Sequence, residues 1–223
     1  MIRTIAIERE FGSGAGTIAR KLADRLGWTI WDEKITQEIA NRLHCDVKSV
    51  EKCEQKPDST FYRLMKTFMR GSYEERYSGS GGELLDAENL SRIFEEMVNE
   101  IADRGPAVIV GRASTYFLRE REDHLALFLY APYHEKMRRL LELGKSEEEA
   151  ERLLMHVDTD RAAFVQRYYG KTWPQRDLYH LMINSIIGDN AVIDLVLRSM
   201  EILNQQISNK SGSGAVESYI HSR

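Results

Sequence analysis

The chain has 223 residues and a formal net charge of -4, so it carries no basic surplus with which to neutralise a nucleic-acid polymer. Hydrophobic residues make up 42% of it and charged residues 30%, which is enough apolar side chain for a folded core and excludes a disordered polymer. The apolar run at the N-terminus is too short for a secretion signal or a membrane span, and Cys45 and Cys53 are too few for a disulfide scaffold. We expect a cytoplasmic protein with reduced thiols, and neither DNA, RNA nor a membrane as a partner.

Short apolar, β-branched runs alternate with amphipathic helical patterns along the chain. The runs predict five strands, at 4–7, 28–31, 106–110, 124–130 and 181–183. The helical patterns predict a helix from 18 to a stop at Gly27, and further helices over 33–43, 47–54, 61–69, 84–103, 135–143, 146–164 and 192–207. The helix at Ser146 opens with a capping-box arrangement. Strands interleaved with helices predict a parallel sheet covered on both faces, with ligands at the carboxyl ends of the strands.

The same pattern divides the chain into a core and two helical additions. The core covers 1–32, 106–135 and 177–207, and the stretch of about 33–105 has helical patterns only, which indicates a helical insertion. A pair of charged helices occupies about 136–176. Residues 208–223 contain a Ser-Gly-Ser-Gly run and are predicted to be a flexible tail.

A glycine-rich loop lies between the first strand and the first helix. Its glycines let backbone N–H groups turn inward, and the helix N-terminus adds the positive end of its dipole, so the loop predicts phosphate binding. The alternative is a purely structural turn. The full phosphate-loop pattern is not met, because Arg9 stands where the first glycine belongs and Ala15 where the lysine belongs.

Five motifs occur in a familiar order over residues 3–205: Arg9-Glu10-Phe11-Gly12-Ser13-Gly14, Trp31-Asp32-Glu33-Lys34, Val110-Gly111-Arg112, Asp158-Thr159-Asp160-Arg161 and Tyr179-His180-Leu181-Met182-Ile183-Asn184-Ser185. In these motifs the chain resembles the cytidylate-kinase-like members of the P-loop nucleoside monophosphate kinases. The resemblance implies the P-loop NTPase fold, a three-layer α/β/α domain with a parallel sheet. It also implies that the insertion binds substrate and that the helices of about 136–176 form a lid.

The resemblance further implies a chemistry, the transfer of a phosphoryl group from ATP, with Mg²⁺, to a nucleoside monophosphate such as CMP or to another small acceptor. The residues that it assigns to the donor phosphates are Gly12, Ser13, Gly14, Ala15, Gly16 and Thr17, with Thr17 or Ser13 nearest the metal.

On the acceptor side, the resemblance implies that Arg112 grips the acceptor phosphate and that Asp158 and Arg161 contact the acceptor nucleotide. The alternatives are a surface arginine and an i,i+3 ion pair on a solvated helix. Lid cations stabilise a transferring phosphoryl group, and Lys136, Arg139 and Arg167 are the candidates, although each also fits a solvated helix face.

Asp32 has two interpretations that the sequence leaves open. In the functional interpretation, Asp32 orients a magnesium-bound water or accepts a hydrogen bond from the hydroxyl of the substrate. In the structural interpretation, it caps the next helix. Lys34 and Arg9 are candidates to replace the missing loop cation. The aromatic residues Tyr168, Tyr169 and Trp173 either stack on a base or pack against the lid hinge.

The chain departs from the family at several charged positions, since Val110 and Ala113 stand where acids are expected, and Glu33 and Glu38 where a serine and an arginine are expected. The predicted function is a phosphotransferase with a nucleoside triphosphate donor. The alternative is a non-catalytic nucleotide-binding protein whose lid acts as a ligand-dependent switch, and a plain interaction module is a third interpretation that leaves the loop unexplained.

Overall fold

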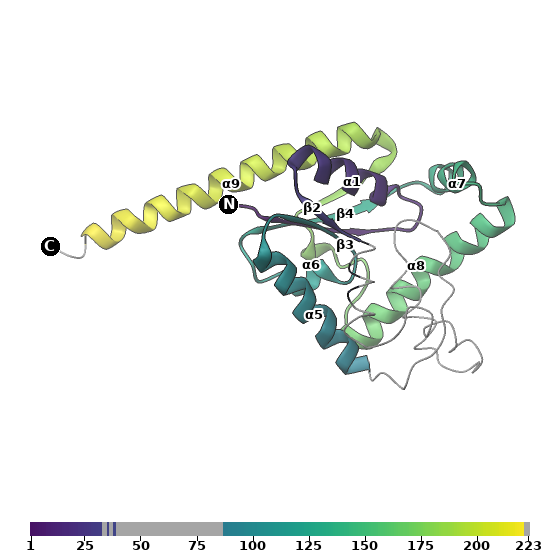
Figure 1. Ribbon diagram of the computed structural model, residues 1–223, viewed down its shortest axis with the longest axis horizontal. Helices are drawn as coiled ribbons and strands as arrows, with labels where there is room; N and C mark the ends of the chain where they lie inside the picture. Colours follow the sequence, from purple (N-terminus) through teal and green to yellow (C-terminus); the bar gives the residue numbers. More distant parts are fainter. Residues whose placement is uncertain (33–34, 36–37, 39–86, 221–223) are drawn as a thin grey trace.

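The computed structural model of the protein describes residues 1–32, 35, 38 and 87–220. In this part of the chain, five parallel strands form one sheet in the order β2-β3-β1-β4-β5, with helices on both faces (Figure 1). The strands are β1 Thr4–Arg9, β2 Thr29–Trp31, β3 Ala107–Val110, β4 His124–Tyr130 and β5 Leu181–Asn184. The helices are α1 Ala15–Leu26, α5 Ala87–Arg104, α6 Ser114–Phe117, α7 Tyr133–Glu142, α8 Glu147–Tyr169 and α9 Asp189–Ile220, with 3-10 turns η2 at Arg176–Leu178 and η3 at Ser185–Ile187. The predicted strands and the three-layer arrangement are confirmed.

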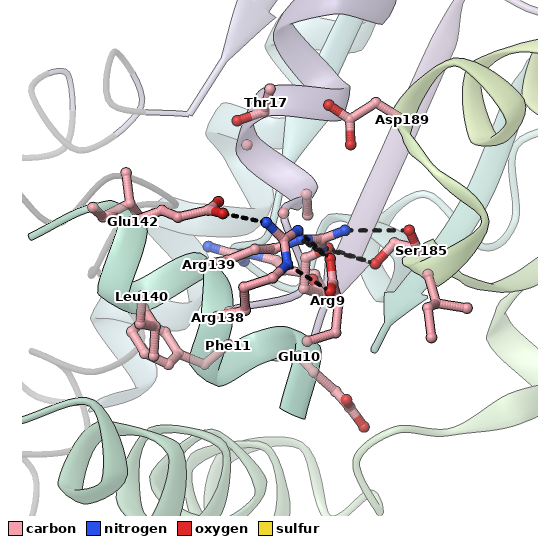
Figure 2. Close-up of a pocket in the computed structure, with 18 of the residues that line it drawn as sticks. Arg9, Glu10, Phe11, Thr17, Arg138, Arg139, Leu140, Glu142, Ser185 and Asp189 are labelled. Carbon is pink, nitrogen blue, oxygen red and sulfur yellow. Dashed lines mark hydrogen bonds and ion pairs between the residues drawn. The ribbon is translucent and has the colours of Figure 1, made fainter. Parts of the chain in front are cut away.

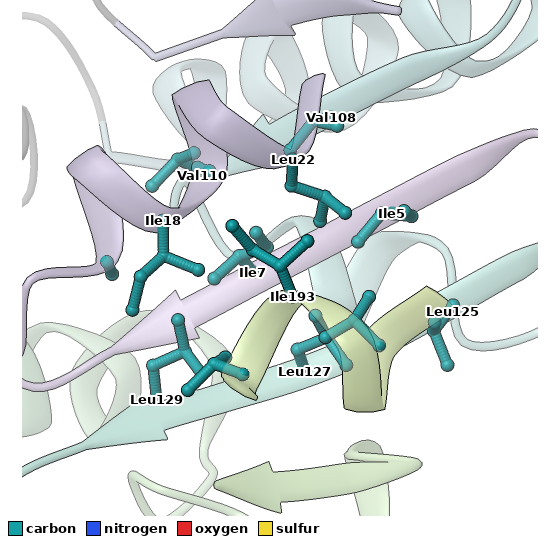
Figure 3. Packing of buried hydrophobic residues seen from close by; sticks show 14 of the residues in the cluster. Ile5, Ile7, Ile18, Leu22, Val108, Val110, Leu125, Leu127, Leu129 and Ile193 are labelled. Atoms are coloured by element: carbon teal, nitrogen blue, oxygen red, sulfur yellow. The ribbon is translucent and has the colours of Figure 1, made fainter. Parts of the chain in front are cut away.

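The central strand β1 is buried on both faces, because alternate side chains of a strand point to opposite sides of the sheet. Ile5 and Ile7 pack against α1 and α9 (Figure 3). On the other face, Ala6 belongs to a core with Phe94 of α5 and Phe164 of α8. Burial of each large aliphatic side chain contributes about 1.5–3 kcal/mol, so the two cores fix β1 and the loop that follows it.

Strand β1 is longer than the sequence predicts. The charged residues after Ile7 were expected to end it, but Glu8 pairs with Phe128 and Arg9 with Leu129 of β4. Both charged side chains are buried, Glu8 at 6% exposure and Arg9 at 4%. Arg161 and Arg112, which are distant in the chain, supply charges opposite to that of Glu8, and a local pattern does not reveal them.

Helix ends follow the predicted caps in two places. Gly27 closes α1 in the left-handed conformation, and the Ser146 hydroxyl accepts a hydrogen bond of 3.2 Å from the N–H of Glu149 at the start of α8. Helix α1 begins at Ala15, three residues earlier than predicted, directly on the glycine loop. Helix α8 continues five residues past the predicted end and stops at Gly170, again left-handed.

Residues 208–220, which belong to the predicted flexible tail, continue helix α9 to Ile220, and their flexibility stays a prediction. Figure 1 shows this helix projecting away from the body of the molecule. Propagation of an existing helix adds one hydrogen bond for each residue fixed, whereas a glycine costs only about 1 kcal/mol relative to alanine. The two glycines of the Ser-Gly-Ser-Gly run therefore weaken the helix without ending it.

Other predictions fall partly or wholly outside the described residues. The predicted helices at 33–43, 47–54 and 61–69, together with Lys34, Cys45 and Cys53, belong to this group. Helix α5 confirms the described part of the helix predicted at 84–103. The division into core, insertion and lid stays a prediction. Among the described helices, none is long and apolar enough to cross a membrane.

At the amino ends of β4 and β5, a histidine takes part in the pairing of the two strands. The N–H of Ala126 donates to Nδ1 of His180 at 2.9 Å, and the N–H of His180 donates to the carbonyl oxygen of Ala126 at 2.9 Å. The ring of His180 packs edge-on against that of His124, with centroids 5.2 Å apart. An imidazolium has no lone pair on Nδ1, so protonation of His180 removes one of these hydrogen bonds.

We expect the stability of the protein to fall as the pH falls below about 6.5, the ordinary histidine value. Burial lowers the pKa of both His180 and His124, so the unfolded chain binds more protons than the folded chain in this range. Unfolding free energies measured between pH 7.5 and 5 should show a smaller acid loss in His180→Asn, whose Oδ1 keeps an acceptor, than in the wild type. The exposed His134→Asn serves as the control, and equal acid slopes in all three proteins would contradict the interpretation.

Candidate phosphate-binding site

The loop between β1 and α1 lines a cavity of about 570 Å³ at the carboxyl edge of the sheet (Figure 2). Gly12 and Gly14 have φ values of 75° and 79°, a left-handed conformation that favours glycine. Within the described chain, no side chain caps α1 and no acidic residue lies in its first turn. The first N–H groups of α1 and its dipole therefore favour an anion at the loop.

The structure brings all six predicted loop residues together. The residues that line the cavity include Gly12, Ser13, Gly14, Ala15, Gly16 and Thr17. The hydroxyl of Ser13 is buried, and among the described residues it meets no hydrogen-bond partner. A buried hydroxyl is normally satisfied, so this atom fits a ligand oxygen in the cavity.

The guanidinium of Arg139 reaches into the loop from α7. Its Nη1 donates to the backbone oxygen of Ser13 and, at 3.0 Å, to the hydroxyl of Ser185. Its Nη2 donates to the backbone oxygen of Ser185 at 3.2 Å. On the other side, Nε lies 3.0 Å from Glu135. The hydrogen bond from Arg138 and the nearby Arg139 lower the pKa of Glu135 to about 2, so this carboxylate stays charged.

The two helices α7 and α8 are joined to the loop through Phe11. Its ring is buried in a small core with Leu140, Leu153 and Val157 of these helices. Its N–H donates to both carboxylate oxygens of Asp158, at 2.9 and 3.1 Å. Lys136 of α7 forms an ion pair with Glu10. The loop therefore packs against the predicted lid through an apolar contact and through charged contacts.

Behind the loop lies a buried cluster of charged side chains. Arg9, Arg112 and Arg161 are at most 4% exposed, and Glu8 lies beside them. Burial, reinforced by the charge of Arg9, lowers the pKa of Arg112 and of Arg161 to about 10. Burial also raises the pKa of Glu8, and the arginines oppose that rise. The positive charges of the three guanidinium groups lower the free energy of an anion bound next to this cluster.

Asp158 and Arg161 form the i,i+3 ion pair that the sequence left as an alternative, at 2.9 Å, but the pair is not on a solvated face. Nη1 of Arg161 also donates to the backbone oxygen of Arg9 at 3.2 Å. The pair thus fixes both ends of the segment from Arg9 to Phe11. Arg161 also lines the cavity, and contact of the pair with an acceptor stays a prediction.

Arg112 and Asp32 do not line the loop cavity. Arg112 is fully buried, and its φ is 63°. Burial lowers the pKa of Arg112, and the negative charge of Asp32 opposes part of that fall. Asp32 follows β2, which β3 separates from β1, and the roles predicted for Arg112 and Asp32 stay predictions. Thr17 is exposed and lines the cavity, and the metal contact predicted for it stays a prediction. Among the described residues, no three acidic, histidine or cysteine side chains form a metal-binding group.

The aromatic residues at the end of α8 pack against the body of the domain. Tyr169 lies 5.2 Å from the ring of Tyr116, and Trp173 lies 5.6 Å from that of Phe128. The packing interpretation therefore accounts for both residues. The side chains of Arg167 and Tyr168 lie outside the described part of the chain.

Sequence reasoning missed two residues of this site. Glu8 lies beyond the strand predicted at 4–7, and no pattern in the neighbouring sequence indicates its burial. Ser185, which is fully buried, donates to the backbone oxygen of Ser13 at 2.6 Å and so joins the end of β5 to the loop. It closes the last of the five motifs, and a polar residue directly after a strand of a parallel sheet was a usable sign.

Comparisons with known proteins agree with this geometry. A structure of an uncharacterized protein from Eubacterium ventriosum is 18% identical, with 90% of this chain and 99% of that one covered at a TM-score of 0.63. A gluconokinase from Sinorhizobium meliloti is 13% identical, with 93% and 97% covered at a TM-score of 0.52. At these identities the likeness shows the fold alone. No curated protein sequence matches the chain. The model of the family described as cytidylate kinase-like matches residues 4–186, and the chain belongs to this family.

Proposed function

We propose that this protein is an ATP- and Mg²⁺-dependent phosphotransferase that acts on a nucleoside monophosphate or another small anionic acceptor. The observation that carries the proposal is the glycine loop at the end of β1, which opens on a cavity of about 570 Å³ and faces cations from α7 and α8. Family membership supports a kinase, and the local charges support the choice of ligands.

The donor phosphates fit the loop. The left-handed Gly12 and Gly14 turn the backbone around the cavity, and the N-terminus of α1 points its dipole at the same place. The hydroxyl of Ser13 has no partner among the described residues and can donate to a phosphate oxygen. Leu143 and Ile186, which are exposed, line the cavity and offer an apolar surface to the base.

Magnesium fits the cavity through Thr17 and the donor phosphates rather than through a cluster of carboxylates. When bound, the ion neutralises charge on the phosphates. Thr17 lines the cavity and Asp32 does not, so we assign the metal contact to Thr17. The lid helices α7 and α8 exclude water from the transferring group, because an open site would favour hydrolysis of the donor.

The acceptor binds, in this proposal, where Arg161 reaches the cavity. Arg9 and Arg161 both line the cavity and belong to the buried cluster. An acceptor that carries a phosphate or a carboxylate near these arginines relieves their mutual repulsion. Arg112 lies behind them and assists by its charge. Transfer breaks the bond from the γ-phosphorus to the bridging oxygen and forms one to an acceptor oxygen.

One observation favours the alternative, a nucleotide-binding protein without turnover. Position 15 is alanine, so the loop itself brings no cation to the β- and γ-phosphates, and the protein would be a binding switch if no other residue does so. The two functions share the donor site and differ in whether an acceptor is phosphorylated.

The test is an ADP-release assay with ATP, Mg²⁺ and a panel of nucleoside monophosphates, sugar acids and other phosphorylated metabolites. We expect acceptor-dependent turnover, with kcat/KM in Thr17→Val lower by at least about tenfold, as for the loss of a group that acts on the transition state. Thr159→Val, at an exposed position of α8, is the matched control. ATP binding, seen as a rise in Tm, without turnover for any acceptor of the panel would favour the binding switch instead.

A further inference from the structure

A cation from the lid already lies in the phosphate loop. Figure 2 shows the side chain of Arg139 reaching from α7 towards the loop and Ser185. A Cβ built on Gly14 would lie 2.5 Å from Nη1 of Arg139 and 2.9 Å from its Cζ. Gly14 directly precedes α1, so the guanidinium lies at the junction of loop and helix where a phosphate would bind.

The place that Arg139 fills is the place where the loop sequence lacks a cation. The phosphate-loop pattern puts a lysine directly after the last loop glycine, and this chain has Ala15 there. The methyl group of Ala15 is buried at 3% exposure and brings no charge. The guanidinium of Arg139 reaches the neighbourhood of the same glycine from another helix.

The groups that hold Arg139 are suited to exchange for a ligand. Its Nη1 and Nη2 donate to uncharged acceptors, the backbone oxygens of Ser13 and Ser185 and the Ser185 hydroxyl. Hydrogen bonds from a guanidinium to phosphate oxygens are roughly twice as strong as those between neutral groups. Glu135 contacts the Nε side and fixes the direction of the side chain without covering the two outer nitrogens. A phosphate in the cavity would therefore be the better partner.

The other cations near the loop are directed elsewhere. Lys136 is paired with Glu10, and Lys21 with Asp189 at 2.8 Å. The guanidinium of Arg9 lies against Gly111, where a Cβ would come within 2.0 Å of Nη1. Arg161 holds Asp158 at 2.9 Å. Arg138 pairs with Glu135 and Glu142, whereas Nη1 of Arg139 contacts the loop backbone at Ser13.

We propose that Arg139 is the cation of the phosphate loop, and that it performs from α7 the role that the phosphate-loop pattern gives to its own lysine. The inference rests on the proposed function for the identity of the ligand, a polyphosphate. It has a consequence of its own. Because the cation belongs to the lid, the loop has its full charge only while α7 is closed over it.

The test moves the cation back to the loop. The proteins are the wild type, Arg139→Ala, Ala15→Lys and the double variant Arg139→Ala/Ala15→Lys, with Arg152→Ala, an exposed arginine of α8, as the control. Calorimetry measures the Kd of inorganic tripolyphosphate and of ATP, and thermal melts establish that each variant is folded.

We expect Arg139→Ala to weaken tripolyphosphate binding by at least about thirtyfold and the double variant to recover at least about tenfold of this loss, since one close, desolvated charge contact is worth roughly 2 kcal/mol or more. Ala15→Lys alone should lower Tm, because the new lysine and Arg139 then repel each other in the loop. This fall should disappear in the double variant. Arg152→Ala should bind as the wild type does. Wild-type affinity in Arg139→Ala, or a folded double variant that remains as weak as Arg139→Ala, would overturn the proposal.

These outcomes are separate from those that test the phosphotransferase. Tripolyphosphate binding needs no acceptor, so the loss and recovery can be seen even if no acceptor of the panel is phosphorylated. In that case the role of Arg139 stands and the kinase proposal falls. If Arg139→Ala keeps its turnover with an unchanged KM for ATP, the kinase proposal stands and the role of Arg139 falls.

Discussion

Replacement of Arg161 by methionine should lower the free energy of unfolding by about 3 kcal/mol. Its guanidinium is 4% exposed and joins the Asp158 carboxylate to the backbone oxygen of Arg9. Removal of one partner of a buried ion pair costs about 3–5 kcal/mol because the other charge stays buried. The loss should fall at the lower end of that range, since the charge of Arg161 also lowers the pKa of Arg112 and its removal relieves that repulsion.

Urea denaturation of Arg161→Met, of Asp158→Asn and of the double variant measures the effect, with Arg152→Met as the exposed control on the same helix. The double variant should lose less than the sum of the two single losses, because it leaves no uncompensated charge. Additive losses, or a loss below 1 kcal/mol in Arg161→Met, would show that the pair does not bear on stability.

Alanine at Gly111 should cost about 3 kcal/mol of folding free energy. The φ of Gly111 is 72°, and the left-handed conformation costs a residue with a Cβ about 1–2 kcal/mol. The new Cβ would also lie 2.0 Å from Nη1 of Arg9, whose side chain is buried at 4% exposure and would have to leave its place in the charged cluster. Overpacking of this kind costs about 1–3 kcal/mol more.

A matched control separates the two causes. Gly27 has a φ of 66°, and a Cβ there would meet nothing within 4 Å, so Gly27→Ala measures the conformational cost alone. Gly111→Ala should be the more destabilising by at least about 1 kcal/mol. In the background of Arg9→Met, whose side chain is shorter, that excess should shrink. Equal losses at Gly27 and Gly111 would mean that Arg9 does not constrain the turn.

The fold was predictable from local patterns because its strands are buried and its helices amphipathic. The run at 125–129 is purely apolar and follows the charged residues 119–123, and β4 occupies the predicted residues 124–130. Ser146 followed by Glu149 predicted the start of α8 by the chemistry of one hydrogen bond. In both cases all the information lies within a few residues of the chain.

The site was predictable only where its residues follow one another in sequence. The loop from Gly12 to Thr17 is such a segment, and it does line the cavity. The contact of Arg139 with Ser13 joins residues 126 positions apart, and that of Asp158 with Phe11 joins residues 147 apart. No local pattern shows which of several arginines in a charged helix turns inward. The burial of Glu8 was missed for a related reason, since only one of the three arginines that lower its pKa against burial, Arg9, is a sequence neighbour, whereas Arg161 and Arg112 are distant.

The anchoring of Phe11 bears on how the protein would exchange its ligand. This residue belongs to the phosphate loop by sequence and to the apolar core of α7 and α8 by packing, and Asp158 holds its backbone. Movement of α7 and α8 away from the loop, as in the lid motion that we propose, therefore has to break the packing of Phe11 and its hydrogen bonds to Asp158. The same contacts of Phe11 then set both the dissociation rate of a nucleotide and the affinity for its phosphates. A substitution that loosens Phe11 should raise the dissociation rate and lower the affinity together.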